Sequence, residues 1–296
     1  MCIRLSLLLL GALPVPALLD DDPRPAEKEE IGWEYKGQLD TEHFRIYYGD
    51  SRKLAEELGL YGEALYKTFQ ETFGDLGDLG ATLPLRVYLF RTKKQYEAYA
   101  AELGPGLVRP LYPQFDPASR TAYMCEKDKG STKEFLVQTF VHENTHALSG
   151  KIMWQAAGIG TWLTEGWADY MQLSVDYEKG ALELGKISQT SKSRHPDVVK
   201  LLIRQGKLIP LADLITMDRV AFHRDVYRTY PESWSLFYFL RHYGSGAYRE
   251  GLKKYIGMAA EGKGGKEAFE EVIGPIDKIA KEWEDYVRTL SSDRVR

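Results

Sequence analysis

Alternation of apolar and polar residues marks two short segments in the first half of the chain, residues 43–48 and 83–90. Because successive side chains of a strand point to opposite faces of a sheet, the alternation predicts strands with one buried face. A third strand is expected over residues 121–126. The residues expected on the buried face of the first two strands are Phe44, Ile46, Tyr48, Leu85, Val87 and Leu89.

Helices are predicted between these strands. Asp50-Ser51 can cap a helix whose apolar residues recur at spacings of three and four from Leu54 to Phe69. A short helix is expected over 94–103, and a loop rich in Gly, Pro and Tyr over 104–120. This order of elements predicts an α+β lobe with a small mixed sheet.

The segment after the third strand carries the signals of a buried helix. Ser131 and Glu134 form a capping box with Ser131 at the N-cap. The helix is expected to run to Ser149 and to stop at Gly150, a favourable residue just past a helix end. Another helix is expected from about Thr161.

From residue 189 onward the pattern is mostly helical, and no internal repeat is evident. The expected organisation is the α+β lobe over 33–128, the metal-site helices over 129–190 and a helical C-terminal lobe over 191–296. These parts are predicted to form one catalytic unit over 31–290. The helices expected in the last part span 197–205, 211–217, 233–243, 248–258, 266–272 and 277–290.

Residues 1–19 have the pattern of an export signal. Arg4 precedes an apolar stretch that ends near the small residue Ala17, and the stretch is too short to span a bilayer comfortably. The charged, proline-containing segment 20–32 is expected to be a flexible linker. The sequence therefore predicts a protein of the periplasm, the cell envelope or the medium, with no stable membrane span after signal cleavage.

Charge and cysteine content narrow the classes of partner and site. The net charge is −4 and the basic residues are scattered, so no nucleic-acid partner is expected. Cys125 is the one cysteine beyond the signal segment, which leaves no intramolecular disulfide. We expect Cys125 to be a small buried strand residue rather than a metal ligand.

His142-Glu143-Asn144-Thr145-His146 is an H-E-x-x-H motif within the predicted buried helix. Residues four apart lie on one helix face, so His142 and His146 can offer two imidazole nitrogens to one metal ion. In a chain with six His, such a motif is expected by chance on the order of 0.01 times. The motif predicts a zinc site.

Three carboxylates accompany the two histidines. Glu165 as a third ligand would leave one coordination position open, as a hydrolytic zinc site requires, and Glu143 beside that position can activate a zinc-bound water. Asp169 lies one turn after Glu165 and can accept the remaining N–H of a ligand histidine. The reverse assignment, with Asp169 as the ligand and Glu165 as its support, fits the same spacing.

The pairing of H-E-x-x-H with E-x-x-x-D resembles the gluzincin branch of zinc metallopeptidases, in peptidase clan MA. The wider chain resembles the peptidase-MA-like domains of exported bacterial proteins, and the matching runs are 41–48, 162–170 and 230–235. This resemblance implies a zincin-like two-lobed fold with Zn²⁺ as the cofactor. The roles that it implies are zinc binding by His142, His146 and Glu165 and general-base catalysis by Glu143.

The resemblance also implies a donor that stabilises the oxyanion formed during hydrolysis. Enzymes of this branch use a Tyr or His from the far lobe. Tyr230 resembles that residue, ahead of a helix expected to begin at Ser233, and His223 is the alternative.

Two further features bear on the substrate. No Gly-Ala-Met-Glu-Asn-like run precedes the metal helix, so an endopeptidase is predicted rather than an aminopeptidase. The strand over Thr121 to Glu126 is expected either to be an edge strand that pairs with an extended substrate or to be an ordinary inner strand.

These observations predict zinc-dependent hydrolysis of a peptide or protein substrate. The alternative is an envelope binding or scaffold protein that keeps the zincin fold with weak catalysis or none. The sequence specifies neither the substrate-binding residues nor an oligomeric state.

Overall fold

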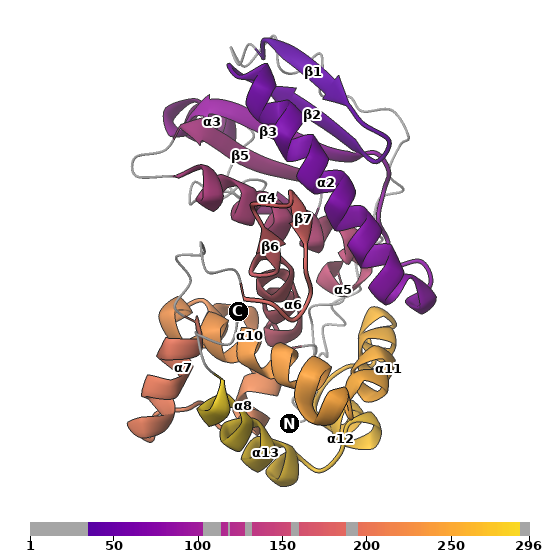
Figure 1. Ribbon diagram of the computed structural model, residues 1–296, viewed down its shortest axis with the longest axis vertical. Coiled ribbons are helices and arrows are strands. Elements are labelled where there is room, and N and C mark those ends of the chain that lie inside the picture. The colour runs from indigo at the N-terminus through magenta and orange to yellow at the C-terminus, as the bar shows by residue number, and fades with distance from the viewer. Residues whose placement is uncertain are drawn as a thin grey trace, which may run out of the picture. The chain divides into compact units, whose positions relative to one another are not determined.

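The first half of the chain folds around a mixed β-sheet, whose strand order is β1-β2-β3-β5-β4. Strands β1, β2, β3 and β5 are labelled in Figure 1. The computed structural model describes residues 35–102, 114–117, 119–127, 132–154, 160–187 and 195–290. Strands β2, β3 and β5 run parallel, whereas β1 and β4 are antiparallel to their neighbours. The strands span Gly37–Asp40 (β1), Phe44–Tyr48 (β2), Leu85–Thr92 (β3), Gln114–Asp116 (β4) and Thr121–Lys127 (β5).

Helices cover both faces of this sheet, so the prediction of half-buried strands is wrong. The predicted inner face packs on α2 (Arg52–Phe73) and α4 (Lys133–Leu148), with Phe44 against Phe140. The other face packs on α3 (Lys93–Glu102). An aromatic layer fills this second interface and consists of Tyr47, Tyr88, Phe90, Tyr96, Tyr99 and Tyr123. Period-two alternation cannot reveal this layer, because tyrosine also suits an exposed position.

The predicted helix caps are partly confirmed. Ser51 caps α2, and its hydroxyl accepts the N–H of Leu54. At α4, Thr132 is the N-cap in place of the predicted Ser131, and its hydroxyl accepts the N–H of Phe135. Either hydroxyl residue is chemically suited to the cap, so the sequence alone decides the position only to within a residue.

The predicted end of the metal-site helix is confirmed to within one residue, but Gly150 does not stop the helical structure there. Helix α4 ends at Leu148, and a second short helix, α5 (Gly150–Trp154), begins at once. Gly150 is instead a point of close approach, because a Cβ there would lie 3.1 Å from the Gly80 carbonyl oxygen.

Helix α6 (Trp162–Gln172) lies between the sheet region and the later helices, in contact with both α4 and α10 (Figure 1). Gly166 permits the approach of α10, since a Cβ there would stand 2.5 Å from the Ser233 carbonyl oxygen. Beside it, Trp167 stacks on Phe69 of α2 and on Phe237 of α10, with ring centroids 5.1 and 5.9 Å away. Close packing on two sides fixes α6 between α2 and α10.

The helical second half is confirmed with shifted boundaries. Its helices span His195–Arg204 (α7), Leu211–Thr216 (α8), Arg219–Phe222 (α9), Val226–His242 (α10), Arg249–Ala260 (α11), Lys266–Val272 (α12) and Ile276–Thr289 (α13). The largest shift is in α10, which begins seven residues before the predicted start and contains Pro231. A small hairpin of Val175–Asp176 (β6) and Ala181–Leu182 (β7), and the short α9, were not predicted.

One continuous hydrophobic core joins these elements, from Phe44 in β2 to Leu290 after α13. The mixed sheet and the helices confirm the α+β class, and the described residues from Tyr35 onward form a single compact unit. Cys125 is a buried residue of β5, as expected. The predicted signal segment 1–19 and linker 20–32 lie outside the described residues. None of the described helices is both long and apolar enough to cross a membrane.

Candidate metal centre

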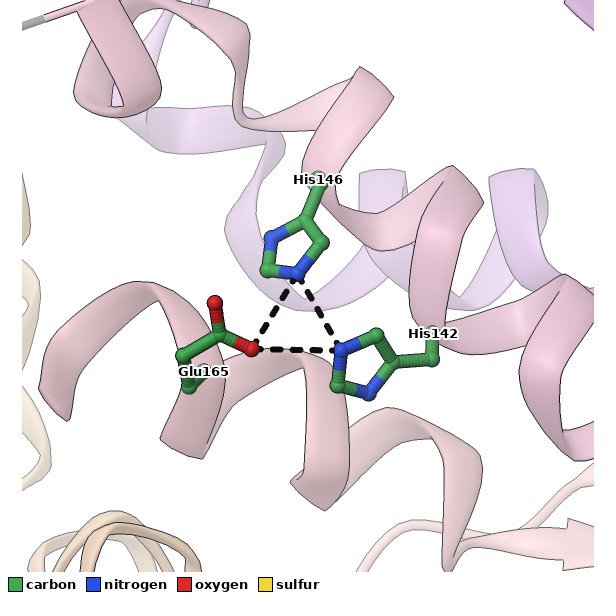
Figure 2. A group of neighbouring side chains, drawn as sticks. All are labelled: His142, His146 and Glu165. Carbon is green, nitrogen blue, oxygen red and sulfur yellow. Dashed lines mark hydrogen bonds and ion pairs between the residues drawn. The ribbon is translucent and has the colours of Figure 1, made fainter. Parts of the chain in front are cut away.

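His142 and His146, one turn apart on α4, point with Glu165 of α6 toward one common point (Figure 2). The two Nε2 atoms are 3.2 Å apart, and Glu165 Oε2 lies 3.3 Å from the first and 3.5 Å from the second. Bonds of about 2.0–2.1 Å to a tetrahedral zinc ion place two ligand atoms about 3.3–3.4 Å apart. The triangle therefore has the dimensions of three zinc ligands.

The charged states of His142 and Glu165 are consistent with a site for a cation. Burial opposes the positive form of His142, but its contacts with Asp169 and Glu165 outweigh burial and hold its pKa well above 6.5. Burial likewise opposes the ionised form of Glu165, but the two histidines hold the pKa of that carboxyl well below its ordinary value. Glu165 Oε2 and His146 Nδ1 are buried without a hydrogen-bond partner. A buried carboxylate between two imidazoles thus offers its charge to a cation.

Asp169 lies on the far side of the His142 ring. Its Oδ1 is 3.0 Å from His142 Nδ1, although the ring N–H is not aligned for a linear hydrogen bond. Of the two assignments that the spacing allowed, the geometry places Glu165 at the Nε2 atoms and Asp169 behind the ring. A carboxylate there favours the tautomer with a proton on Nδ1 and a free Nε2 lone pair.

Two more side chains hold Asp169 in place. His195 Nε2 lies 2.7 Å from Oδ2, and the Gln172 amide donates to Oδ1 at 2.9 Å. Burial raises the pKa of Asp169, but His195 and His142 outweigh burial and lower it. Asp169 is therefore an ionised, fully buried acceptor.

Glu143, the predicted general base, contacts the sheet. Its Oε2 accepts the backbone N–H of Phe115 in β4 at 2.6 Å. Burial raises the pKa of Glu143, the two histidines oppose the rise, and Glu165 adds to it. A carboxylate with a raised pKa is a stronger proton acceptor, which suits a general base.

Tyr230 and His223, the two predicted oxyanion donors, lie together beside the triangle. The Tyr230 ring stacks on the His142 ring with centroids 6.3 Å apart, and its hydroxyl lies 3.4 Å from His223 Nε2. His223 Nδ1 donates to the Arg219 carbonyl, so in the neutral ring Nε2 accepts from the phenol. Burial and then the nearby carboxylates raise the pKa of Tyr230 well above 10. In this hydrogen bond the Tyr230 hydroxyl is therefore the donor, and Tyr230 lies within α10 rather than ahead of it.

Sequence reasoning missed β4 and His195. Strand β4 falls within the segment expected to be a loop, and among the described strands it forms the edge of the sheet beside β5. Of the two alternatives for Thr121 to Glu126, the inner strand is therefore confirmed and the edge strand is wrong. His195 stands immediately before Pro196 at the start of α7, and no local motif links it to a residue 26 positions earlier.

A second group of potential ligands, Glu42, His43 and Glu63, has a structural explanation. The Glu63 carboxylate accepts the Thr41 hydroxyl, the His43 backbone N–H and the His43 ring. His43 also stacks on Tyr66 at 3.6 Å. These contacts tie α2 to the start of β2.

Comparison of the sequence with protein-family models and with curated proteins gives no match. A proposal for the function therefore rests on the motif and on the geometry of the centre.

Proposed function

We propose that this chain is a zinc-dependent peptidase of gluzincin type, with the zincin-like two-lobed arrangement that its motifs imply. The observation that carries the proposal is the buried triangle of His142, His146 and Glu165, with ligand atoms 3.2–3.5 Å apart. Two neutral nitrogens and one carboxylate oxygen are a donor set of hydrolytic zinc enzymes.

The surrounding residues fit the steps of peptide hydrolysis. When bound, zinc would supply a Lewis acid that lowers the pKa of water and polarises a carbonyl. Glu143 would accept the proton of the attacking water and pass it to the leaving amine. The Tyr230 hydroxyl would donate to the oxyanion, and the buried Asp169 would keep the His142 ring oriented.

The proposed substrate is a peptide or protein, cleaved internally. The absence of a run that would hold a free N-terminus favours an endopeptidase. Export to the periplasm, the envelope or the medium is part of the same proposal and rests on residues 1–19.

Elemental analysis after reconstitution with zinc tests the centre. We expect about one zinc ion per chain, and we expect His146→Ala to lose it. His43→Ala is the matched control, because His43 belongs to the second ligand group. Zinc that persists in His146→Ala, or that disappears in His43→Ala, would contradict the assignment.

Hydrolysis of a broad peptide library tests the catalytic step. Glu143→Gln should retain zinc and lose activity by about 10²–10⁴-fold, because the amide cannot accept the proton. The alternative, a zincin-fold binding protein, predicts no hydrolysis by the wild type and no difference between the two proteins. Equal turnover by wild type and Glu143→Gln would rule out Glu143 as the base.

A further inference from the structure

We propose that His195 is a positioning residue of the metal centre, acting through Asp169 on the ligand His142. The proposal rests on the function proposed above. It adds a third element to the centre, since His195 is the first residue of α7, whereas the ligands come from α4 and α6.

One hydrogen bond and one close ion-pair contact link α7 to the ligand. His195 Nε2 is 2.7 Å from Asp169 Oδ2, and Asp169 Oδ1 is 3.0 Å from His142 Nδ1. His142 Nε2 in turn faces Glu165 Oε2. Asp169 therefore uses one oxygen toward the ligand and the other toward His195.

The direction of the first hydrogen bond follows from chemistry. An ionised carboxylate can only accept, so His195 must donate its Nε2–H to Asp169. The donation fixes the plane of the carboxylate, because it holds Oδ2 while Gln172 holds Oδ1 at 2.9 Å. A fixed carboxylate in turn limits rotation of the His142 ring.

His195 supplies a restraint that α6 cannot supply alone. Gln172 shares a helix with Asp169, and its bond to Oδ1 leaves the carboxylate free to turn about that oxygen. The His195 ring is itself held from α10, where Trp234 contacts it edge-on with centroids 5.9 Å apart. The metal centre is thereby tied to the packing of α7 against α10.

Partners of this kind typically change metal affinity by about 10–100-fold when they are removed. The dissociation constant for zinc, measured by competition with a chromogenic chelator, is therefore the readout. His195→Phe keeps a flat ring against Trp234 but has no donor, and we expect its zinc dissociation constant to rise by about 10–100-fold. His195→Gln retains an N–H donor, and we expect its constant to stay within a few-fold of wild type.

His242 of α10 provides a matched control, because it contacts Tyr170, the residue that follows Asp169 in α6. His242 Nε2 bonds the Tyr170 hydroxyl at 2.9 Å, so it joins α10 to α6 as His195 joins α7 to α6, but it does not touch Asp169. His242→Phe should leave the zinc constant unchanged. If His195→Phe does not fold, as judged by circular dichroism of the metal-free protein, His195→Leu provides a smaller side chain without a donor for the same comparison.

A double-mutant cycle with Asp169→Asn tests whether His195 acts on His142 through Asp169. If His195 acts through Asp169, adding His195→Phe to Asp169→Asn should weaken zinc binding little further. Fully additive losses would overturn the proposal, as would a constant for His195→Phe within twofold of wild type. Failure of the wild type itself to bind zinc would instead overturn the proposed function.

Discussion

At the residue scale, the charge on His142 bears on the proposed binding of zinc. In the metal-free protein Asp169 and Glu165 favour the charged imidazole, so His142 keeps a proton to a pH well above 6.5. A histidine that binds a metal must be neutral, so zinc at the proposed site would have to displace that proton. The same contacts that hold the ring would therefore make binding of the proposed zinc ion depend on pH.

We expect zinc affinity to rise with pH across the neutral range. While His142 is protonated in the metal-free state, each unit of increase should tighten binding by roughly tenfold for the one proton released. Above the raised pKa of His142 this dependence should disappear. Chelator competition between pH 6 and 9 measures it, and affinity that does not change over that range would contradict a protonated His142.

Substitutions of Tyr230 and of His223 are expected to have different effects on catalysis. Tyr230→Phe should retain zinc and lower kcat by about 10²–10³-fold, because it removes one donor to the oxyanion. His223→Asn should have a smaller effect, since His223 lies behind the phenol, with its Nε2 3.4 Å from the Tyr230 hydroxyl. Peptide hydrolysis by the two variants decides between them, and the reverse ranking would make His223 the donor.

At the element scale, a buried carboxyl joins α10 to the start of α8. Glu232 is fully buried, and its carboxyl accepts the Ile209 N–H at 3.0 Å and the Arg228 guanidinium at 3.2 Å. Burial raises the pKa of Glu232 to about 7, although both partners oppose the rise. The group therefore couples the packing of α10 to pH.

The sign of this coupling is set by proton binding. Between pH 4.5 and 7 the folded protein keeps a proton on Glu232 that the unfolded chain releases, so the free energy of unfolding falls as pH rises. The shift corresponds to a loss of roughly 3 kcal/mol across this interval, and Glu232→Gln should lack that loss. Urea unfolding from pH 4.5 to 8 measures the difference.

Glu250→Gln, at an exposed position of α11, is the control for Glu232→Gln. It should follow the wild-type pH profile. A Glu232→Gln profile that also follows the wild type would show that the carboxyl does not keep its proton.

At the scale of the whole molecule, Trp167 of α6 packs between the sheet-side helix α2 and α10. It is fully buried between Phe69 and Phe237. Trp167→Ala should lower the free energy of unfolding by about 3–5 kcal/mol, through lost burial and the cavity left behind. Because the core is continuous, sheet and helices should unfold in one transition.

Tyr227→Ala is the matched control, because that aromatic ring is 86% exposed. Its effect should lie within about 0.5 kcal/mol. Circular dichroism and tryptophan fluorescence during urea unfolding provide both readouts. Two separated transitions would show that the second half of the chain unfolds independently of the sheet.

Features that depend on residues close to one another in the chain follow from the sequence alone. The four-residue spacing of His142 and His146 sets two imidazoles on one helix face wherever that helix packs. Apolar periodicity located the helices and the main strands, because each buries a stripe or a face. The Glu165–Asp169 spacing likewise placed both carboxylates along one face of α6.

Only the tertiary structure decided contacts between distant segments. It placed β4 rather than β5 at the edge, brought the Phe115 N–H to Glu143 and carried His195 to Asp169. It also covered the second face of the sheet and set Glu165 rather than Asp169 at the Nε2 atoms. A strand of three residues has too few positions to show a period, and a contact across 26 residues leaves no periodic signal. Such features arise only when elements pack against one another.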